Sequence, residues 1–171
     1  NRFELLYSST DFRQDPSIVI PFGSRIPIKK SENILETTDI DGGKYYLKSP
    51  ITNESRDRRE QIIYNSKKLL GSPYLWGGKT PFGYDCSGFV QSVYRIANLD
   101  IKRDTSAQIE EPRMTDIDIE SVERGDLLFF NIEGRGVDHV GIWFENDNII
   151  HCGGELKIQS IYDDSHIKLS E

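Results

Sequence analysis

The sequence predicts an α+β protein in which a small strand-rich module, residues 1–52, precedes a larger domain, residues 53–171. Up to about Pro50, short apolar runs are broken by turn residues, as in a series of short strands. Apolar residues at helical spacing follow, and beyond Gly125 the pattern returns to that of strands. Helices that precede strands in this way are typical of the α+β class.

The first module contains apolar runs of strand length, separated by turn signals such as Pro21-Phe22-Gly23 and Asp41-Gly42-Gly43. Several short strands at this spacing predict a small β-barrel. The strands are expected at Phe3–Tyr7, Ile18–Ile20, Ile26–Lys29, Ile34–Thr38 and Tyr45–Leu47.

The larger domain is expected to begin with helices and to end with strands. From Glu54 to Leu70 the apolar residues share one face at helical spacing, and the same holds from Cys86 to Ala97 after a Gly-rich passage. The later strands are expected at Leu127–Asn131, His139–Phe144, Ile149–Cys152 and Lys157–Ile161.

Composition narrows the classes of function. A net charge of −7 argues against a nucleic-acid partner, because phosphate binding needs clustered Lys and Arg. No stretch approaches the roughly 18 apolar residues of a membrane span. The chain starts without a methionine or a signal-peptide pattern, so we expect either a fragment or a chain that has lost a leader. We expect a monomer without a cofactor.

Cys86 is the candidate nucleophile, since it lies at the expected first turn of a helix in Asp85-Cys86-Ser87-Gly88-Phe89. Unpaired N–H groups and the helix dipole stabilise a thiolate there, whereas the carboxylate of Asp85 opposes it. The structural alternative is that Asp85 is an N-cap and Cys86 a small buried residue. For Cys86 considered alone, this alternative is preferred.

Two histidines would favour a catalytic role for Cys86 over the structural one if they lie on the same face of a β-hairpin. A two-residue loop, Asn146-Asp147, would set Phe144 opposite Ile149 and place His139 and His151 on opposite faces. A three-residue loop, residues 145–147, would place His151 opposite Gly141, on the same face as His139. We predict the three-residue loop, which unites the apolar residues on one core face.

This register gives each candidate a role. Cys86 would be the nucleophile, His139 the base and later the acid, and His151 the residue that orients His139. Cys152 would face the core, so no disulfide with Cys86 is expected. His166 lies in a polar tail and is expected to be solvated.

The alternative is a metal site built from Asp138, His139, His151 and Cys152. Strand alternation separates these ligands, and the sequence has no HExxH or CxxC spacing. We therefore expect no metal.

Five ordered motifs between about Arg58 and Ile161 resemble the NlpC-type, papain-like cell-wall peptidases. They are Tyr74-Leu75-Trp76-Gly77-Gly78, Phe82 to Val90, Gly125 to Phe130, Asp138 to Ile142, and Ile150-His151. The resemblance implies a papain-like fold and hydrolysis of the bond from the γ-carboxyl of D-glutamate to diaminopimelate or lysine in peptidoglycan stem peptides.

The first module resembles the bacterial SH3-like module that often precedes this domain, most closely at residues 20–25. It could be incomplete, because family members often have longer N-terminal regions. In the family this module supplies an acidic residue to the ligand's amine. Glu4, Glu32 and Glu36 are the candidates here.

The resemblance also implies a set of substrate contacts. Asp85, with Ser87 nearby, would hold the ammonium of a stem peptide whose N-terminal L-alanine is free. Further contacts would come from Tyr74 and Trp76, which line the pocket, and from the matching stretch Arg103-Asp104-Thr105. Tyr74 would also donate to the oxyanion, together with the Cys86 N–H.

Without the resemblance, Tyr74 and Trp76 could equally be core aromatics, and Arg103 with Asp104 a surface ion pair.

Two rival functions remain open. One is an amidase or acyltransferase that uses the same Cys and His residues with a different pocket. The other is a non-catalytic wall-binding protein in which the SH3-like module carries the function. The cell envelope or secretion is the expected location, with cytoplasmic recycling of wall fragments as the alternative.

Overall fold

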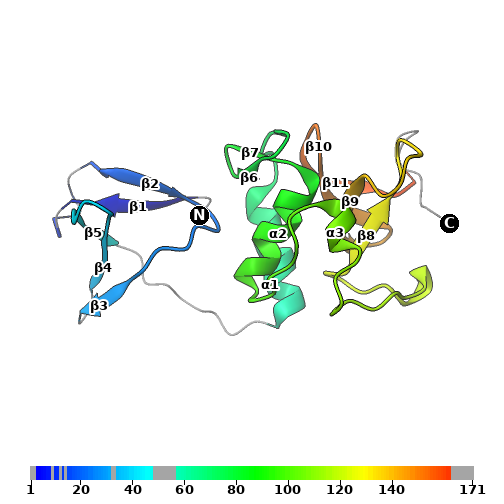
Figure 1. Cartoon of the computed structure of the whole chain (residues 1–171), viewed down its shortest axis with the longest axis horizontal. Coiled ribbons are helices and arrows are strands. Elements are labelled where there is room, and N and C mark those ends of the chain that lie inside the picture. The colour runs from blue at the N-terminus through cyan, green and yellow to red at the C-terminus, as the bar shows by residue number, and fades with distance from the viewer. Residues whose placement is uncertain are drawn as a thin grey trace. The chain divides into compact units, whose positions relative to one another are not determined.

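The computed structural model describes residues 3–8, 10, 11, 13, 15–31, 34–47 and 57–162. The chain divides into two compact units, Asn1–Ser55 and Arg56–Glu171. Strands make up the first unit, and helices followed by strands make up the second (Figure 1). The α+β prediction is therefore confirmed.

The first unit is an antiparallel sheet with strand order β2-β1-β5-β4-β3. Its strands are β1 (Phe3–Tyr7), β2 (Ile18–Pro21), β3 (Lys29–Ser31), β4 (Ile34–Thr38) and β5 (Lys44–Leu47). The strand predicted at Ile26–Lys29 is wrong, since β3 begins only at Lys29. Pro27 has no N–H to donate to a ladder, and Ile26 packs against the small core instead.

The core of the first unit is formed by Leu6, Ile20 and Leu47, with Ile26, Leu35 and Tyr45 packed against them. Among the described residues the ladder ends at β2 and β3, so closure into an SH3-like barrel stays a prediction. Of the acidic candidates, Glu36 forms an ion pair with Lys44, 3.4 Å away. Glu32 and the side chain of Glu4 lie outside the described residues.

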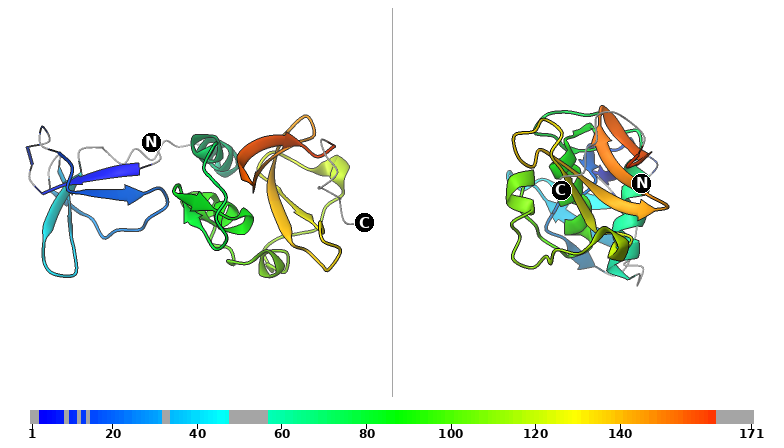
Figure 2. Two further views of the ribbon diagram at one scale, coloured as in Figure 1. Left: turned by 90° about the horizontal axis from the view of Figure 1, so that it is seen from above. Right: turned by 90° about the vertical axis from the view of Figure 1, so that its right-hand side faces the viewer.

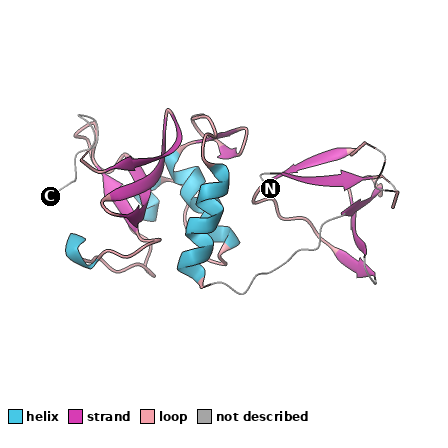
Figure 3. Ribbon diagram, turned by 180° about the vertical axis from the view of Figure 1, so that it is seen from behind, coloured by secondary structure: helices cyan, strands magenta, loops and turns pink. Residues whose placement is uncertain are grey.

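The second unit begins with two packed helices, α1 (Arg58–Leu69) and α2 (Cys86–Ile96) (Figure 3). The side chain of Asp57 caps α1 by accepting the Arg59 N–H at 3.0 Å. A short hairpin of β6 (Lys79–Thr80) and β7 (Gly83–Tyr84) lies between the helices in the sequence. The short helix α3 (Thr105–Gln108) and the 3₁₀ turn η1 (Ile119–Ser121) follow.

An antiparallel sheet with order β11-β10-β9-β8 completes the second unit (Figure 2). Its strands are β8 (Leu127–Phe130), β9 (His139–Glu145), β10 (Asn148–Gly153) and β11 (Glu155–Ser160). Helix α2 lies against β9 and β10. The start of the helix is thereby brought close to the strands that carry the histidines.

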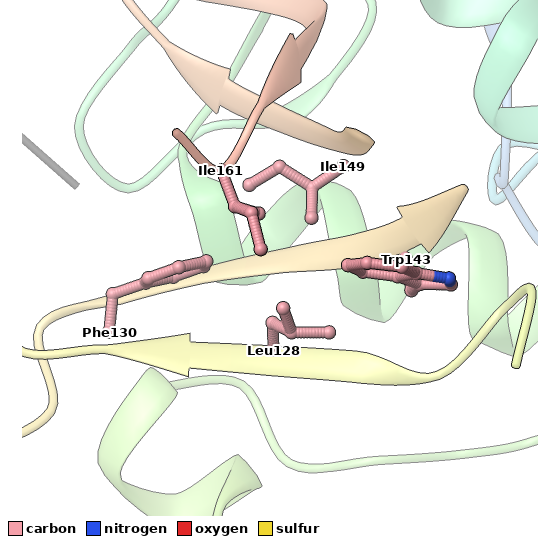
Figure 4. Packing of buried hydrophobic residues seen from close by; sticks show 5 residues of the cluster. All are labelled: Leu128, Phe130, Trp143, Ile149 and Ile161. Atoms are coloured by element: carbon pink, nitrogen blue, oxygen red, sulfur yellow. The ribbon is translucent and has the colours of Figure 1, made fainter. Parts of the chain in front are cut away.

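Both faces of this sheet are buried. Val140, Ile142, Ile150 and Cys152 alternate onto one face, and each is 0% exposed. The other face carries a cluster formed by Leu128, Phe130, Trp143, Ile149 and Ile161 (Figure 4). Strands packed on both sides provide a rigid support for side chains at their ends.

Candidate active site

Cys86 is the first residue of α2, as predicted, and the preceding residue caps the helix. Asp85 has extended backbone angles, and its Oδ1 accepts the Gly88 N–H at 2.6 Å. Cys86 and Asp85 are each 8% exposed. The structural description of an N-cap followed by a buried thiol is therefore correct, and the catalytic role depends on what surrounds the thiol.

The thiol of Cys86 lies among polar groups from three elements. The Thr105 hydroxyl on α3 is 3.8 Å from Sγ, and the backbone N–H groups of Val140 and Ser87 also contact the sulfur. Burial raises the pKa of Cys86, and the Asp85 carboxylate adds to this, while the three hydrogen bonds oppose it. The net shift is upward and favours the neutral thiol.

The hairpin that carries the histidines has a two-residue turn, so the predicted three-residue loop is wrong. Asn146 and Asp147 have φ values of 49° and 59°, and Glu145 pairs with Asn148. Consecutive residues with positive φ form the turn whose twist matches antiparallel strands, and Asn and Asp tolerate this conformation.

A β-bulge nevertheless gives the predicted pairing. The register shifts after Asn148, so that Ile149 lies opposite Trp143 and Phe144 is left as the extra residue. His151 therefore lies opposite Gly141, on the same face as His139. The predicted arrangement of the histidines is confirmed, although a bulge produces it rather than the loop.

The two imidazole rings are in direct contact. His139 Nε2 and His151 Nδ1 are 2.8 Å apart, and the ring planes are nearly perpendicular at 89°. His139 is 8% exposed and His151 4%. Gly141 provides the space, because a Cβ at this position would lie 3.2 Å from Cβ of His151.

Burial keeps both histidines neutral at pH 7. It lowers the pKa of His139 to about 4, helped by the neighbouring His151 and opposed by Asp138. Burial also lowers the pKa of His151, with the charge of Lys157 acting in the same direction and the hydrogen bond from His151 Nε2 to the Gln159 amide oxygen opposing it. A neutral imidazole beside a neutral thiol is a base that can accept the thiol proton.

Sequence reasoning missed Gln159, whose Oε1 lies 3.0 Å from His151 Nε2. Gln159 is on β11, where Lys157 pairs with His151 and Gln159 lies diagonal to it. The sequence signal that could have found this contact is the turn at Gly153-Gly154. The turn sets the register between β10 and β11, and therefore which side chains of β11 share a face with His151.

Arg103 and Asp85 form a bidentate ion pair near the start of α2. Arg103 Nη1 and Nη2 lie 3.0 and 2.6 Å from the two oxygens of Asp85, and Nη1 also donates to Ser87 Oγ at 2.9 Å. Only 26% of the Arg103 side chain and 11% of the Asp85 side chain are exposed, so this is not a surface pair. The arginine's salt-bridge partner is Asp85 rather than Asp104, which is exposed.

Tyr74 and Trp76 lie in the loop before β6 and are not core aromatics, since they are 37% and 86% exposed. Partial burial raises the pKa of Tyr74, and the nearby Cys86 thiol and Asp85 carboxylate add to the shift. The phenol of Tyr74 therefore lies near the sulfur of Cys86. Trp76 presents most of its ring to solvent beside this region.

Within the ranges that the structure describes, no group of three or more His, Cys, Asp or Glu side chains could hold a metal ion. Cys86 and Cys152 are both free, and Cys152 points away from the pair of histidines to donate to the Tyr84 carbonyl at 3.2 Å.

The same described ranges contain no helix with the length and apolar character of a membrane span.

A buried cysteine at a helix start, beside a strand that contributes one of two paired histidines, is the arrangement of the papain-like class within an α+β fold. The NlpC/P60 family model matches residues 71–168. The chain belongs to this family.

Two relatives support the assignment, both described as gamma-D-glutamyl-L-lysine dipeptidyl-peptidase. The Bacillus cereus protein is 32% identical over 136 residues, which cover 78% of this chain and 37% of the relative. The Bacillus subtilis protein is 32% identical over 142 residues, or 80% of this chain and 47% of the relative. The matched part of the chain thus spans less than half the length of either relative.

Solved structures agree with the fold. An NlpC/P60 family protein from Bacillus cereus has a TM-score of 0.80 at 25% identity, covering 98% of this chain and 58% of its own. The NlpC/p60 domain of the peptidoglycan hydrolase SagA has a TM-score of 0.54 at 36% identity, covering 60% of this chain and 89% of its own.

Proposed function

We propose that this chain is a cysteine endopeptidase that hydrolyses the bond between the γ-carboxyl of D-glutamate and lysine or diaminopimelate in peptidoglycan stem peptides. The observation that carries the proposal is the pair of buried, neutral histidines 2.8 Å apart, beside a buried cysteine at a helix start. The activity after which the two Bacillus relatives are named supports the choice of bond.

In this mechanism the thiol and the imidazole start neutral. Cys86 Sγ attacks the carbonyl carbon of the γ-glutamyl bond while its proton passes to His139, which His151 orients. The oxyanion accepts hydrogen bonds from the Cys86 N–H and the Tyr74 hydroxyl. His139 then protonates the leaving amine, and a water molecule, activated by the same imidazole, hydrolyses the thioester.

The substrate's free ammonium is proposed to bind at the carboxylates beside the nucleophile. Asp85 already accepts hydrogen bonds from Gly88, Gly77, Arg103 and Ser87. These donors occupy about all the lone-pair sites of a carboxylate, so an ammonium at Asp85 displaces one of them. The Ser87 hydroxyl, at 3.4 Å, is the weakest.

Other residues complete the proposed pocket. The exposed carboxylate of Asp104 provides a second contact for the ammonium, and the rings of Tyr74 and Trp76 line the peptide. Thr105 lies against the thiol, where its hydroxyl can donate to a developing thiolate. We further propose that the protein acts on the wall in the cell envelope or after secretion, with recycling of wall fragments in the cytoplasm as the alternative.

The test is product analysis with L-Ala-γ-D-Glu-L-Lys and its diaminopimelate counterpart. We expect mass spectrometry to detect the dipeptide L-Ala-D-Glu with the wild-type chain and none with Cys86→Ala. Cys152→Ala is the matched control, because this buried thiol points to the Tyr84 carbonyl, and the variant should retain activity.

Three outcomes would contradict the proposal. Cleavage by Cys86→Ala would exclude this nucleophile. Release of a different product would favour an amidase or acyltransferase. A wild-type chain that binds muropeptide without cleaving it would favour the wall-binding alternative.

The contribution of the ammonium is measured by comparing each peptide with its N-acetylated form. We expect acetylation to raise KM, and we expect Asp104→Asn to reduce the difference between the two forms. If acetylated and free peptides are cleaved equally well, the preference for a free N-terminus is wrong.

A further inference from the structure

The side chain of Gln159 contacts His151 at the ring nitrogen that does not face His139. Its Oε1 lies 3.0 Å from His151 Nε2, while the other nitrogen of His151 lies 2.8 Å from His139 Nε2. Gln159 is half-buried on β11 and is held by the ladder between β10 and β11. It therefore extends the chain of hydrogen-bonding groups by one member beyond the histidines.

We propose that Gln159 is a positioning residue that sets the proton positions on both histidines, so that Nδ1 of His139 carries the lone pair that accepts the Cys86 proton. This inference rests on the proposed peptidase function for its consequence in catalysis. The proton positions themselves follow from the orientation of the Gln159 amide and do not depend on that function.

The donor and acceptor roles along this chain of groups are linked, beginning at the amide of Gln159. In the structure the amide of Gln159 turns its oxygen, not its NH2 group, toward His151; this oxygen only accepts hydrogen bonds, so with this orientation His151 Nε2 carries a proton and donates it to Gln159. A neutral imidazole holds one proton, and His151 Nδ1 is consequently an acceptor. His139 Nε2 must then donate to it, which leaves the lone pair of His139 on Nδ1.

The opposite arrangement of protons would block the reaction. If His151 carried its proton on Nδ1, it would donate to His139 Nε2, and the proton of His139 would lie on Nδ1. That nitrogen could not accept a proton from the thiol. A hydrogen-bond acceptor at position 159 selects the productive arrangement, whereas a donor there would select the unproductive one.

The charges around the histidines explain why a neutral amide suits this position. Asp138 raises the pKa of His139, while Lys157 lowers that of His151 from the same face of β11. A carboxylate at position 159 would accept the same hydrogen bond but would favour the charged imidazole. The amide selects the proton position while leaving the base neutral.

Three substitutions separate these properties. Gln159→Glu keeps an acceptor, Gln159→Met has similar length and neither donates nor accepts a strong hydrogen bond, and Gln159→Lys is only a donor. Ile158→Val is the matched control, since Ile158 is the neighbouring residue of β11 with its side chain on the opposite face.

We expect kcat/KM on the stem peptide to fall about tenfold in Gln159→Met, the loss associated with one hydrogen bond to a group that becomes charged. Gln159→Lys should lose more than about a hundredfold, while Gln159→Glu should stay within a few-fold of the wild type at its own optimum. The acid limb of the Gln159→Glu pH profile should move to higher pH, because its carboxylate stabilises imidazolium.

Nitrogen NMR of the imidazole rings supplies a readout that does not require peptidase activity. In the wild type both histidines should carry their proton on Nε2, and in Gln159→Lys both should carry it on Nδ1. The rate of Cys86 alkylation by iodoacetamide should follow the same order of variants as the kinetics.

These measurements distinguish a failure of the proposed peptidase function from a failure of the proposed role of Gln159. If the wild type cleaves no stem peptide, the proposed function fails, but the spectra still decide the proton positions. If Gln159→Met and Gln159→Lys retain the wild-type spectrum and the wild-type alkylation profile, Gln159 does not set the proton positions. Similar losses in Ile158→Val would likewise overturn the proposal, because they would reflect a general disturbance of β11.

Discussion

His139 should make the stability of the second unit depend on pH. Burial lowers its pKa from 6.5 to about 4 in the folded protein. Between these values the unfolded chain binds a proton that the folded protein does not, so the stabilising contribution is complete above pH 6.5 and is lost as the pH falls. With about 1.4 kcal/mol for each pKa unit, the loss is about 2 kcal/mol at pH 5 and about 3 kcal/mol near pH 4.

Urea unfolding at pH 7 and pH 5, followed by the fluorescence of buried Trp143, measures this contribution. The free energy of unfolding should fall by about 2 kcal/mol more in the wild type than in His139→Gln, which cannot titrate at this position. His166 lies outside the described residues, and the sequence predicts it to be solvated, so His166→Gln serves as the control that tests that prediction by behaving like the wild type. Equal pH dependence in the wild type and His139→Gln would refute the reasoning, because it would mean that His139 is protonated as easily as in the unfolded chain.

Three further substitutions test how the site is supported. Gly141→Ala places a Cβ 3.2 Å from Cβ of His151, so we expect a loss of roughly 1–3 kcal/mol in stability and of about tenfold in kcat/KM; unchanged kinetics would show that His151 needs no fixed position. Gly88→Ala would drive a Cβ into a backbone carbonyl of the preceding loop, and thermal unfolding should show a Tm lower by several degrees. Arg103→Lys loses the two-pronged contact with Asp85 and should raise KM more than it lowers kcat, which steady-state kinetics would contradict if only kcat fell.

Much of the catalytic centre could be predicted because it follows from local rules. Asp85 before an apolar helical pattern indicates a helix start, and alternation along β9 and β10 assigns each histidine to a face. These rules gave the position of Cys86 and the shared face of His139 and His151, both of which the structure confirms.

The rest depended on geometry that local patterns do not specify. A two-residue turn with a bulge and a three-residue loop give the same pairing beyond the turn, so the sequence could not distinguish them. The partner of Arg103 is Asp85, 18 positions away in the sequence, rather than its neighbour Asp104. Such a contact depends on how the segment before α3 approaches the start of α2, which periodicity does not reveal.

The bulge at Phe144 also determines where this hairpin can tolerate a change in length. Removal of Phe144 would leave Glu145 opposite Asn148 and Trp143 opposite Ile149, so the histidines would stay together. Removal of Ile142 would instead shift His139 to the opposite face, although every catalytic residue would still be present. In an alignment with relatives whose hairpins differ by one residue, the gap therefore belongs at Phe144, and a gap on the other side of Trp143 would mark a sequence that has lost the paired histidines.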